Sequence, residues 1–148
     1  MVTGTEVVWQ AQYGATDNDQ SPVVTPDTIF CIRSISKSVT ALGVLIAVQQ
    51  GLVSLDLPIS HYLPEFAINS RFDTNPAQLI TLRKMLSHSV GFTHDPPLGL
   101  DLDQSDYFEQ YVNRISDTWL RFPVGYRHQY SNYCIDLAAH IIAKRSGC

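Results

Sequence analysis

The sequence predicts an α+β fold, in which strand-forming segments near the N-terminus precede a larger helical body. Residues 5–13 are rich in β-branched and aromatic residues and stop at Gly14, which is typical of a strand. Residues 34–50 form an apolar segment of helix length with almost no charge. Mainly helices and loops are expected after it. Two strands make a poor sheet, so either a hairpin joins an all-helical core or partner strands are missing.

The segment between the first strand and the main helix is expected to be mostly irregular. Residues 15–22 are polar and rich in turn-forming residues, which predicts a loop. Residues 23–32 are apolar at both ends but contain Pro26. They favour either a short strand or an extended lead-in to the helix.

Residues 34–50 give the clearest helix prediction, because apolar and small residues cover nearly the whole circumference of the helix. A helix of this kind is usually buried. Ser34 suits the N-cap position, and Gly51 suits the C′ position just beyond the C-terminal end. Lys37 is the only charged residue in the segment, which is an unusual place for an ammonium group.

The later elements are predicted to be shorter and to be separated by loops. Thr81 is a suitable N-cap for a short helix that ends by Gly91. The other predicted features are an ordered loop with helical turns over residues 54–66, a helix over residues 107–120, a turn at residues 123–125 and a helix over residues 135–145.

Composition excludes several classes of function. The chain has 148 residues, about one domain, and its formal net charge of -4 is spread along the sequence, which argues against binding to nucleic acid. The longest apolar run, residues 41–48, is much too short to span a membrane. No basic segment followed by an apolar one opens the chain, so no signal peptide is expected. Compartment and oligomeric state stay open.

The cysteines predict neither a disulfide framework nor a zinc site. There are three of them, Cys31, Cys134 and Cys148, and no C-x-x-C motif occurs. Cys31 and Cys134 are expected to be small buried hydrophobic residues.

Ser34 and Lys37 form a candidate pair for nucleophilic catalysis. Residues three apart share a face of a helix, so the two side chains can touch. A serine hydroxyl needs a base to take its proton. Burial in an apolar helix and the positive end of the helix dipole both lower the pKa of a lysine, so Lys37 could be that base. The alternative is that Ser34 only caps the helix and Lys37 extends to the surface.

Other catalytic patterns have less support. His88 and His94 are six residues apart, and neither helical spacing nor a third ligand favours a metal site. His88 is expected to make a structural hydrogen bond within its own element. A serine hydrolase with a nucleophile elbow would need the motif G-x-S-x-G, which does not occur.

Four stretches resemble, in the same order, the serine β-lactamase-like and penicillin-binding superfamily. The resemblance is closest to its branch of class C β-lactamases, D-aminopeptidases and esterases, and it covers residues 22–148. The stretches are "VTPDTIFCIRSISKS" with S-x-x-K, "GLVSLDLPISHYLPEF", "TLRKMLSHSVGF", and "FPVGYRHQYSNYCIDLAAHIIAKRSG" with Y-x-N.

The resemblance implies an antiparallel sheet packed with a helical subdomain, and it implies site residues. Ser34 would be the acylated nucleophile and Lys37 its base partner. Tyr130 would share the general acid and base work, and Asn132 would bind the amide of the substrate. No metal or cofactor is implied. The alternatives are a packing role for Tyr130 in a loop and an N-cap role for Asn132, which is compatible with substrate binding.

The third motif of this superfamily, K-T-G or H-x-G on a later strand, does not follow Tyr130 in these residues. We therefore expect residues 1–148 to be one incomplete domain of this fold, truncated with most sheet strands missing. Residues 1–31 would supply edge strands of the sheet, and residues 32–148 would form the helical subdomain with the active-site motifs. We also expect the fragment itself to be inactive.

The expected function is that of a serine hydrolase that forms an acyl-enzyme on Ser34 and cleaves amide or ester bonds. The substrate would be a small molecule or peptide, namely a β-lactam, a D-amino-acid peptide or a small ester. The alternatives are a non-catalytic binding homologue of the same fold and an inactive fragment. Members of the superfamily are often periplasmic or secreted, but this chain leaves its location open.

Overall fold

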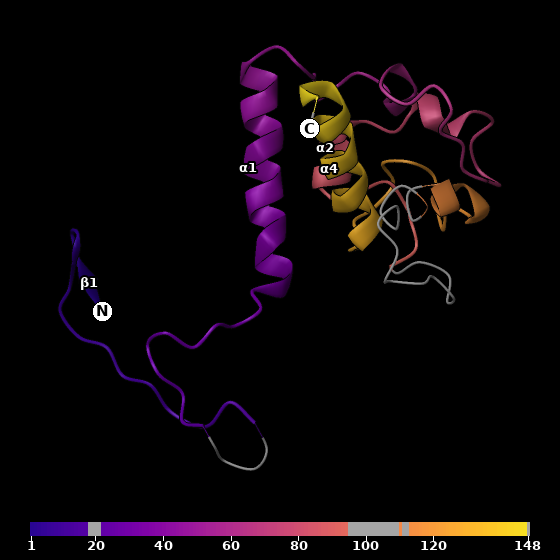
Figure 1. Cartoon of the computed structure of the whole chain (residues 1–148). Helices are drawn as coiled ribbons and strands as arrows, with labels where there is room; N and C mark the ends of the chain where they lie inside the picture. The colour runs from indigo at the N-terminus through magenta and orange to yellow at the C-terminus, as the bar shows by residue number, and fades with distance from the viewer. Residues whose placement is uncertain (18–21, 95–109, 111–112, 148) are drawn as a thin grey trace. The chain divides into compact units, whose positions relative to one another are not determined.

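The computed structural model describes residues 1–17, 22–94, 110 and 113–147 (Figure 1). The chain divides into two compact units, Met1–Arg33 and Ser34–Cys148. The first contains the strands, and the second contains the helices and the hydrophobic core.

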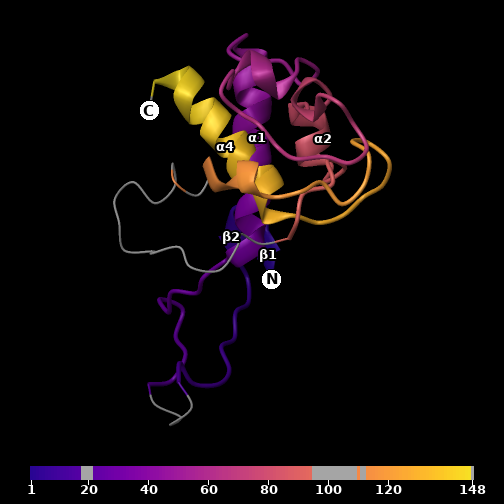
Figure 2. The ribbon, with the colours of Figure 1, turned by 90° about the vertical axis from the view of Figure 1, so that its right-hand side faces the viewer.

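The N-terminal unit contains one small antiparallel hairpin. Strand β1, Val2–Thr3, pairs with β2, Glu6–Val7, across a turn in which Gly4 has a φ of 62°; Figure 2 labels both strands. The predicted strand over residues 5–13 is therefore wrong for residues 8–13, for which the described residues supply no partner strand.

The lead-in to the main helix is extended rather than a strand. Its only ladder contact is an isolated bridge between Ala15 and Val23. Residues 23–32, all of which are described, contain no strand. Of the two predicted alternatives, the extended lead-in is confirmed.

A 3-10 turn, η1, Arg33–Ile35, leads into helix α1, Ser36–Gln49. Ser34 therefore lies in the turn before the helix, and the N-cap residue is Ile35, so the predicted cap role of Ser34 is wrong. The C-terminal end is as predicted, because Gly51 adopts a φ of 74° that an L side chain rarely adopts. The amide of Gly51 donates to the carbonyl of Val48 at 3.0 Å, and the next amide donates to the carbonyl of Ala47 at 2.9 Å.

The other helices of the second unit are short, apart from the last one. The Thr81 side chain accepts a hydrogen bond from the Lys84 amide, so the predicted N-cap of α2 is confirmed. The predicted helix over residues 107–120 lies partly outside the described residues; within its described part, residues 110 and 113 are α-helical and the 3-10 turn η4 follows. The elements are η2, Ile59–His61; η3, Pro76–Gln78; α2, Leu82–Leu86; η4, Arg114–Asp117; and α4, Asn132–Ser146.

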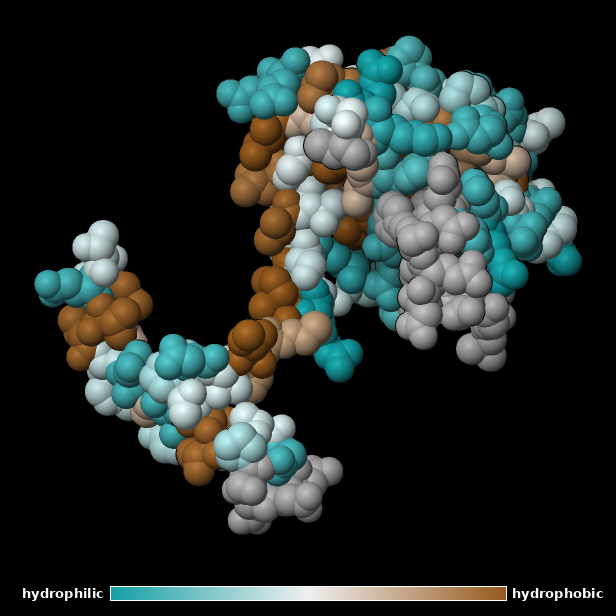
Figure 3. Space-filling view, viewed as in Figure 1, coloured by the Kyte–Doolittle hydropathy of each residue, from teal (hydrophilic) through white to brown (hydrophobic). Residues whose placement is uncertain are grey.

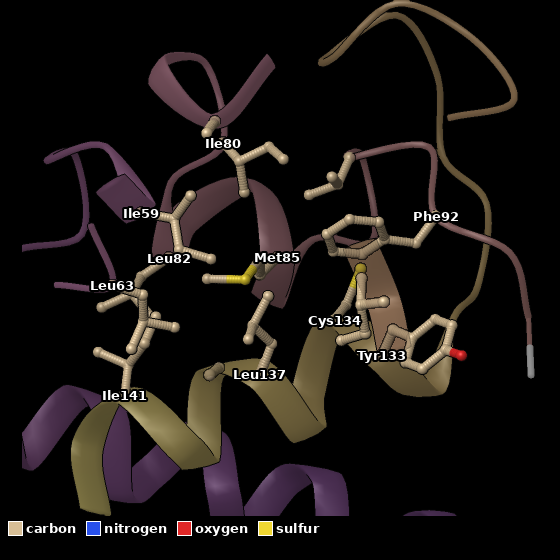
Figure 4. Close-up of a cluster of buried hydrophobic side chains, with 14 of the residues drawn as sticks. Ile59, Leu63, Ile80, Leu82, Met85, Phe92, Tyr133, Cys134, Leu137 and Ile141 are labelled. Atoms are coloured by element: carbon tan, nitrogen blue, oxygen red, sulfur yellow. The ribbon is translucent and has the colours of Figure 1, made fainter. Parts of the chain in front are cut away.

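The core of the second unit is built on the buried face of α4. Figure 4 shows this face packed against side chains from α2 and from the segments on either side of it. Apolar residues recur along α4 at helical spacing, which is the pattern of a helix with one buried face. The fully buried side chains include Ile59, Leu63, Ile80, Leu82, Met85, Phe92, Tyr133, Leu137 and Ile141.

Helix α1 packs against α4 along one face only. Gly43 faces α4, and a Cβ atom at that position would make an ordinary van der Waals contact with Ile142 Cδ1 at 3.5 Å. Val44 and Ala47 are the only buried residues of α1. Figure 3 shows a row of hydrophobic side chains exposed along the helix. The predicted burial of the whole circumference is therefore wrong for Val39, Leu42, Leu45 and Ile46.

No helix in the described part of the chain is both long enough and apolar enough to cross a membrane.

Candidate active site

The side chains of Ser34, Lys37 and Tyr130 meet at the N-terminal end of α1. Ser34 Oγ accepts a hydrogen bond from Lys37 Nζ at 3.2 Å and another from the Tyr130 hydroxyl at 2.7 Å. Lys37 Nζ also lies 5.1 Å from the centroid of the Tyr130 ring. The structure thus brings together the three residues that the sequence predicts as catalytic, although Tyr130 is 96 positions from Ser34 in the chain.

Helix geometry accounts for the contact between Ser34 and Lys37. The two residues are three apart across the junction of η1 and α1, so their side chains project on the same side. Ser34 is exposed and Lys37 is half-buried. The predicted deep burial of Lys37 is therefore wrong, because the apolar face of α1 around it is itself largely exposed.

The environment of Tyr130 favours its ionised form. The Lys37 ammonium is the main cause that lowers the pKa of Tyr130, and the hydrogen bond to Ser34 lowers it further. A cation beside a phenol stabilises the phenolate, so the proton of Tyr130 is easier to remove than that of an isolated phenol. The ring also packs against two imidazoles, with centroid distances of 4.7 Å to His88 and 5.5 Å to His94.

Hydrogen bonds from neighbouring segments fix the loop that carries Tyr130. The Gln129 amide donates to the His88 carbonyl at 2.8 Å. The buried Ser131 donates its amide to His88 Nδ1 at 3.3 Å and its hydroxyl to the Thr93 carbonyl at 2.7 Å. These bonds tie the chain on both sides of Tyr130 to the segment that follows α2.

Asn132, the predicted substrate-binding residue, is the first residue of α4 and is half-buried. Its backbone amide donates to the His94 carbonyl at 3.1 Å. The N-cap residue of α4 is Ser131, so the N-cap alternative for Asn132 is wrong. Asn132 follows Tyr130 by two positions, which keeps it at the same end of α4.

A tight turn of the backbone brings the segment after α2 close to this loop. Gly91 has a φ of 96°, and a Cβ atom there would lie 2.9 Å from the Phe122 carbonyl oxygen. Glycine is therefore required at this position for the two segments to pack. The Arg121 amide donates to the Gly91 carbonyl at 2.9 Å, which joins the two segments.

Sequence reasoning missed the role of His88 in this arrangement. The predicted hydrogen bond within its own element exists between the His88 amide and the Met85 carbonyl, at 3.0 Å. The imidazole, however, contacts the Tyr130 loop. The signal available in the sequence was the position of His88 in the L-x-H-x-S-like stretch, but periodicity gives no information on a contact 43 residues away.

Within the described part of the chain, the cluster has neither a metal site nor a reactive thiol from Cys134 beside it. Among the described residues, no group of three or more side chains could hold a metal ion. Burial raises the pKa of the Cys134 thiol to about 12, so it stays protonated near neutral pH and acts as the predicted small hydrophobic residue. Cys31 is exposed, so its predicted burial is wrong, and Cys148 lies outside the described residues.

A protein-family model described as Beta-lactamase matches residues 1–147. The chain belongs to the Beta-lactamase family. The resemblance inferred from the four sequence stretches is thereby confirmed.

Solved structures of related proteins have the same fold as this Beta-lactamase family chain. FmtA from Staphylococcus aureus superposes with a TM-score of 0.74 at 23% identity, over 91% of this chain and 35% of that one. A class C β-lactamase in complex with cefoxitin gives a TM-score of 0.68 at 26% identity, over 90% of this chain and 34% of the other. The predicted β-lactamase/transpeptidase fold is confirmed.

Curated relatives of this family member include proteins of different activity. It is 32% identical to Beta-lactamase-like protein 2 of Dictyostelium discoideum over 94% of the chain and 26% of the relative. It is 26% identical to Esterase EstB of Burkholderia gladioli over 96% of the chain and 38% of the esterase. The chain therefore spans between about a quarter and two fifths of the length of these relatives.

Proposed function

We propose that this chain carries the nucleophile half of a serine hydrolase that forms an acyl-enzyme on Ser34 and cleaves amide or ester bonds. The observation that carries the proposal is the position of Ser34 Oγ, within hydrogen-bonding distance of both Lys37 Nζ and the Tyr130 hydroxyl. A serine hydroxyl held against two groups that can exchange its proton is the arrangement that covalent catalysis requires.

The pair formed by Lys37 and Tyr130 takes the proton of Ser34. Both groups donate to Ser34 Oγ in the resting arrangement, so the pair must first lose a proton before it can accept one. The lowered pKa of Tyr130 makes its phenolate, beside Lys37, an accessible form of the pair. Proton transfer then frees the Ser34 oxygen for attack.

Acylation follows in two steps. Ser34 Oγ forms a bond to the carbonyl carbon of the substrate while its proton passes to the Tyr130 oxygen. The tetrahedral intermediate collapses, the bond to the leaving group breaks, and Tyr130 returns the proton to the departing amine or alcohol. Water then attacks the acyl-enzyme with the same pair as base and releases the acid. Asn132 binds the amide of the substrate during these steps.

The substrate class is a small amide or ester. Similar proteins are named as an esterase, as a class C β-lactamase with bound cefoxitin, and as a D-amino acid amidase from Ochrobactrum anthropi SV3 solved with phenylalanine amide. The amidase is 28% identical and superposes with a TM-score of 0.69 over 84% of this chain and 33% of that one. The three names refer to an ester, a β-lactam and an amide, which are acyl compounds that a nucleophilic serine can open.

We further propose that hydrolysis needs a later strand with K-T-G or H-x-G, which no stretch after Tyr130 in these residues provides. In the superfamily that the chain resembles, that strand supplies a second hydrogen-bond donor to the oxyanion. Loss of one such donor typically costs about 10²–10³ in rate.

A covalent probe tests the proposal. A fluorophosphonate or a fluorescent penicillin is incubated with the 148-residue chain and with a longer form that includes a strand of this type. We expect label on the longer form, and loss of at least about 95% of it in Ser34→Ala, because no other described hydroxyl has the same two partners.

Ser36→Ala is the matched control, since Ser36 is also an exposed serine at the start of α1 and should label normally. Label that persists in Ser34→Ala, or a longer form that takes no label, would contradict the proposal. The second result would favour a non-catalytic binding protein of the same fold.

A further inference from the structure

We propose that His88 is a positioning residue, which holds the Tyr130 hydroxyl against Ser34 while its own imidazole is neutral and protonated on Nε2. This inference rests on the proposed function, because it assigns His88 to the same reaction.

Three contacts of His88 bracket Tyr130 along the chain. The His88 carbonyl accepts from the amide of the residue before Tyr130, at 2.8 Å. The imidazole Nδ1 accepts from the amide of the residue after it, at 3.3 Å. The imidazole ring stacks on the Tyr130 ring itself, with an interplanar angle of 30°. One residue thus restrains both the backbone and the ring of Tyr130, and the hydroxyl ends 2.7 Å from Ser34 Oγ.

The backbone of His88 adopts a strained conformation at the position where it makes these contacts. Its φ of 53° lies in the left-handed region, which residues with a Cβ atom rarely adopt. Among the described residues that are not glycine, only Arg33 shares this property, and Arg33 immediately precedes Ser34. Strain of this kind clusters at functional sites, where surrounding contacts hold it in place. Both strained positions therefore adjoin the two ends of the bond between Tyr130 and Ser34.

The hydrogen bond from Ser131 fixes the protonation state of His88. Because Nδ1 accepts a proton, it carries none, and the single proton of the neutral ring is on Nε2. Burial lowers the pKa of His88, and the nearby His128 and Lys37 lower it further, so the neutral form prevails near neutral pH. Protonation in acid would break the bond to Ser131 and add a cation to a cluster that already holds the Lys37 ammonium.

The proposal predicts that the acylation rate falls at low pH as His88 becomes protonated; this fall is called the acid limb below. A group with a lowered pKa is neutral at neutral pH and becomes charged only as the pH falls below the ordinary histidine value of about 6.5. We therefore expect the position of Tyr130 to be lost below that pH. The loss should be absent when residue 88 is an acceptor that cannot titrate.

Two variants separate the functions of the side chain. His88→Asn keeps an acceptor oxygen near the Nδ1 position and tolerates a positive φ, whereas His88→Phe keeps a ring to stack but loses the acceptor. Per active site, counted by covalent titration of Ser34, we expect kcat/KM for acylation to fall by about 10–100-fold in His88→Phe. In His88→Asn we expect a fall of less than about 10-fold and a flat acid limb. His61→Asn, in η2, is the control and should behave like the parent protein.

A readout that does not depend on hydrolysis accompanies the kinetics. Carbon-13 NMR of the tyrosine ring carbons measures the pKa of Tyr130 in the 148-residue chain, assigned with Tyr130→Phe. We expect the pKa to rise toward the ordinary value of about 10 in His88→Phe, since a displaced phenol loses its contact with Lys37. Nitrogen-15 spectra should show His88 in the Nε2-protonated form in the parent chain.

The outcomes separate the two proposals. If Ser34 never takes a covalent label but His88→Phe raises the pKa of Tyr130, the proposed function fails and the positioning role stands. If Ser34 is labelled and both His88 variants match the parent in kcat/KM per site, in the acid limb and in the pKa of Tyr130, the positioning role is overturned. A purely structural role would lower the melting temperature and the titrated fraction of sites without changing any of these three quantities.

Discussion

At the scale of single residues, the Ser34 hydroxyl differs from other serines of α1 in what reaches it. Ser36 and Ser38 are also exposed near the start of the helix, but Ser34 Oγ is the atom that accepts from both Lys37 and Tyr130. The spacing of three residues predicts the contact with Lys37. The contact with Tyr130 depends on the path of the chain between them, which spacing along the sequence does not encode.

The pH dependence of acylation is predicted from Tyr130. Its pKa is lowered, so the phenolate forms at a lower pH than that of an ordinary phenol, and acylation should rise with pH and level off below about pH 10. Tyr130→Phe should reduce the acylation rate by about 10²–10⁴-fold. The measurement is the rate of probe labelling across pH on the longer form. A plateau that stays at the same pH in Tyr130→Phe would show that another group sets the limb.

At the scale of elements, the ends of helices were more predictable than the faces they bury. The Thr81 cap of α2 and the glycines at residues 51 and 147 act locally, so their roles follow from residue type alone. The exposure of Leu42 on α1 does not follow from residue type, because it depends on which surfaces are present to cover the helix. The strand prediction for residues 8–13 was wrong for a similar reason, because a strand needs a partner strand, which the described residues do not supply.

The short helix α2 should depend strongly on its N-cap. Thr81 Oγ1 accepts from the Lys84 amide, and α2 has only five residues, so few other bonds hold it. Thr81→Ala should lower the free energy of unfolding by about 1 kcal/mol. Thr81→Ser keeps the oxygen and should lower it by less. Urea unfolding of the three proteins measures both values. An equal loss in both variants would mean that the methyl group, and not the cap, stabilises the helix.

At the scale of the whole molecule, the candidate cluster of Ser34, Lys37 and Tyr130 lies at the edge of a hydrophobic core that the described residues cover on one side only. The buried face of α4 meets α2 and the loops around it, whereas one apolar face of α1 is exposed. The chain also spans only 26% and 38% of two relatives. Together, these facts support the proposal that residues 1–148 are part of a longer domain whose remaining strands cover α1. A sequence pattern does not show which surfaces are present to cover a helix, which is why the predicted burial of α1 on all sides was wrong.

A pair of leucines tests this proposal. Leu42 on α1 is 57% exposed, whereas Leu137 on α4 is fully buried. In the 148-residue chain, Leu42→Ala should change the free energy of unfolding by less than about 0.5 kcal/mol. In a longer form, where strands bury the side chain, the same change should cost about 2–5 kcal/mol, because it removes packed methyl groups and leaves a cavity. Leu137→Ala should cost about 2–5 kcal/mol in both forms, since its packing lies within the described core. Denaturant unfolding of the two variants in both forms, each against its parent protein, provides the comparison. If Leu42→Ala were equally harmless in the longer form, the exposed face of α1 would remain uncovered there, and the proposed completion of the domain over α1 would be wrong.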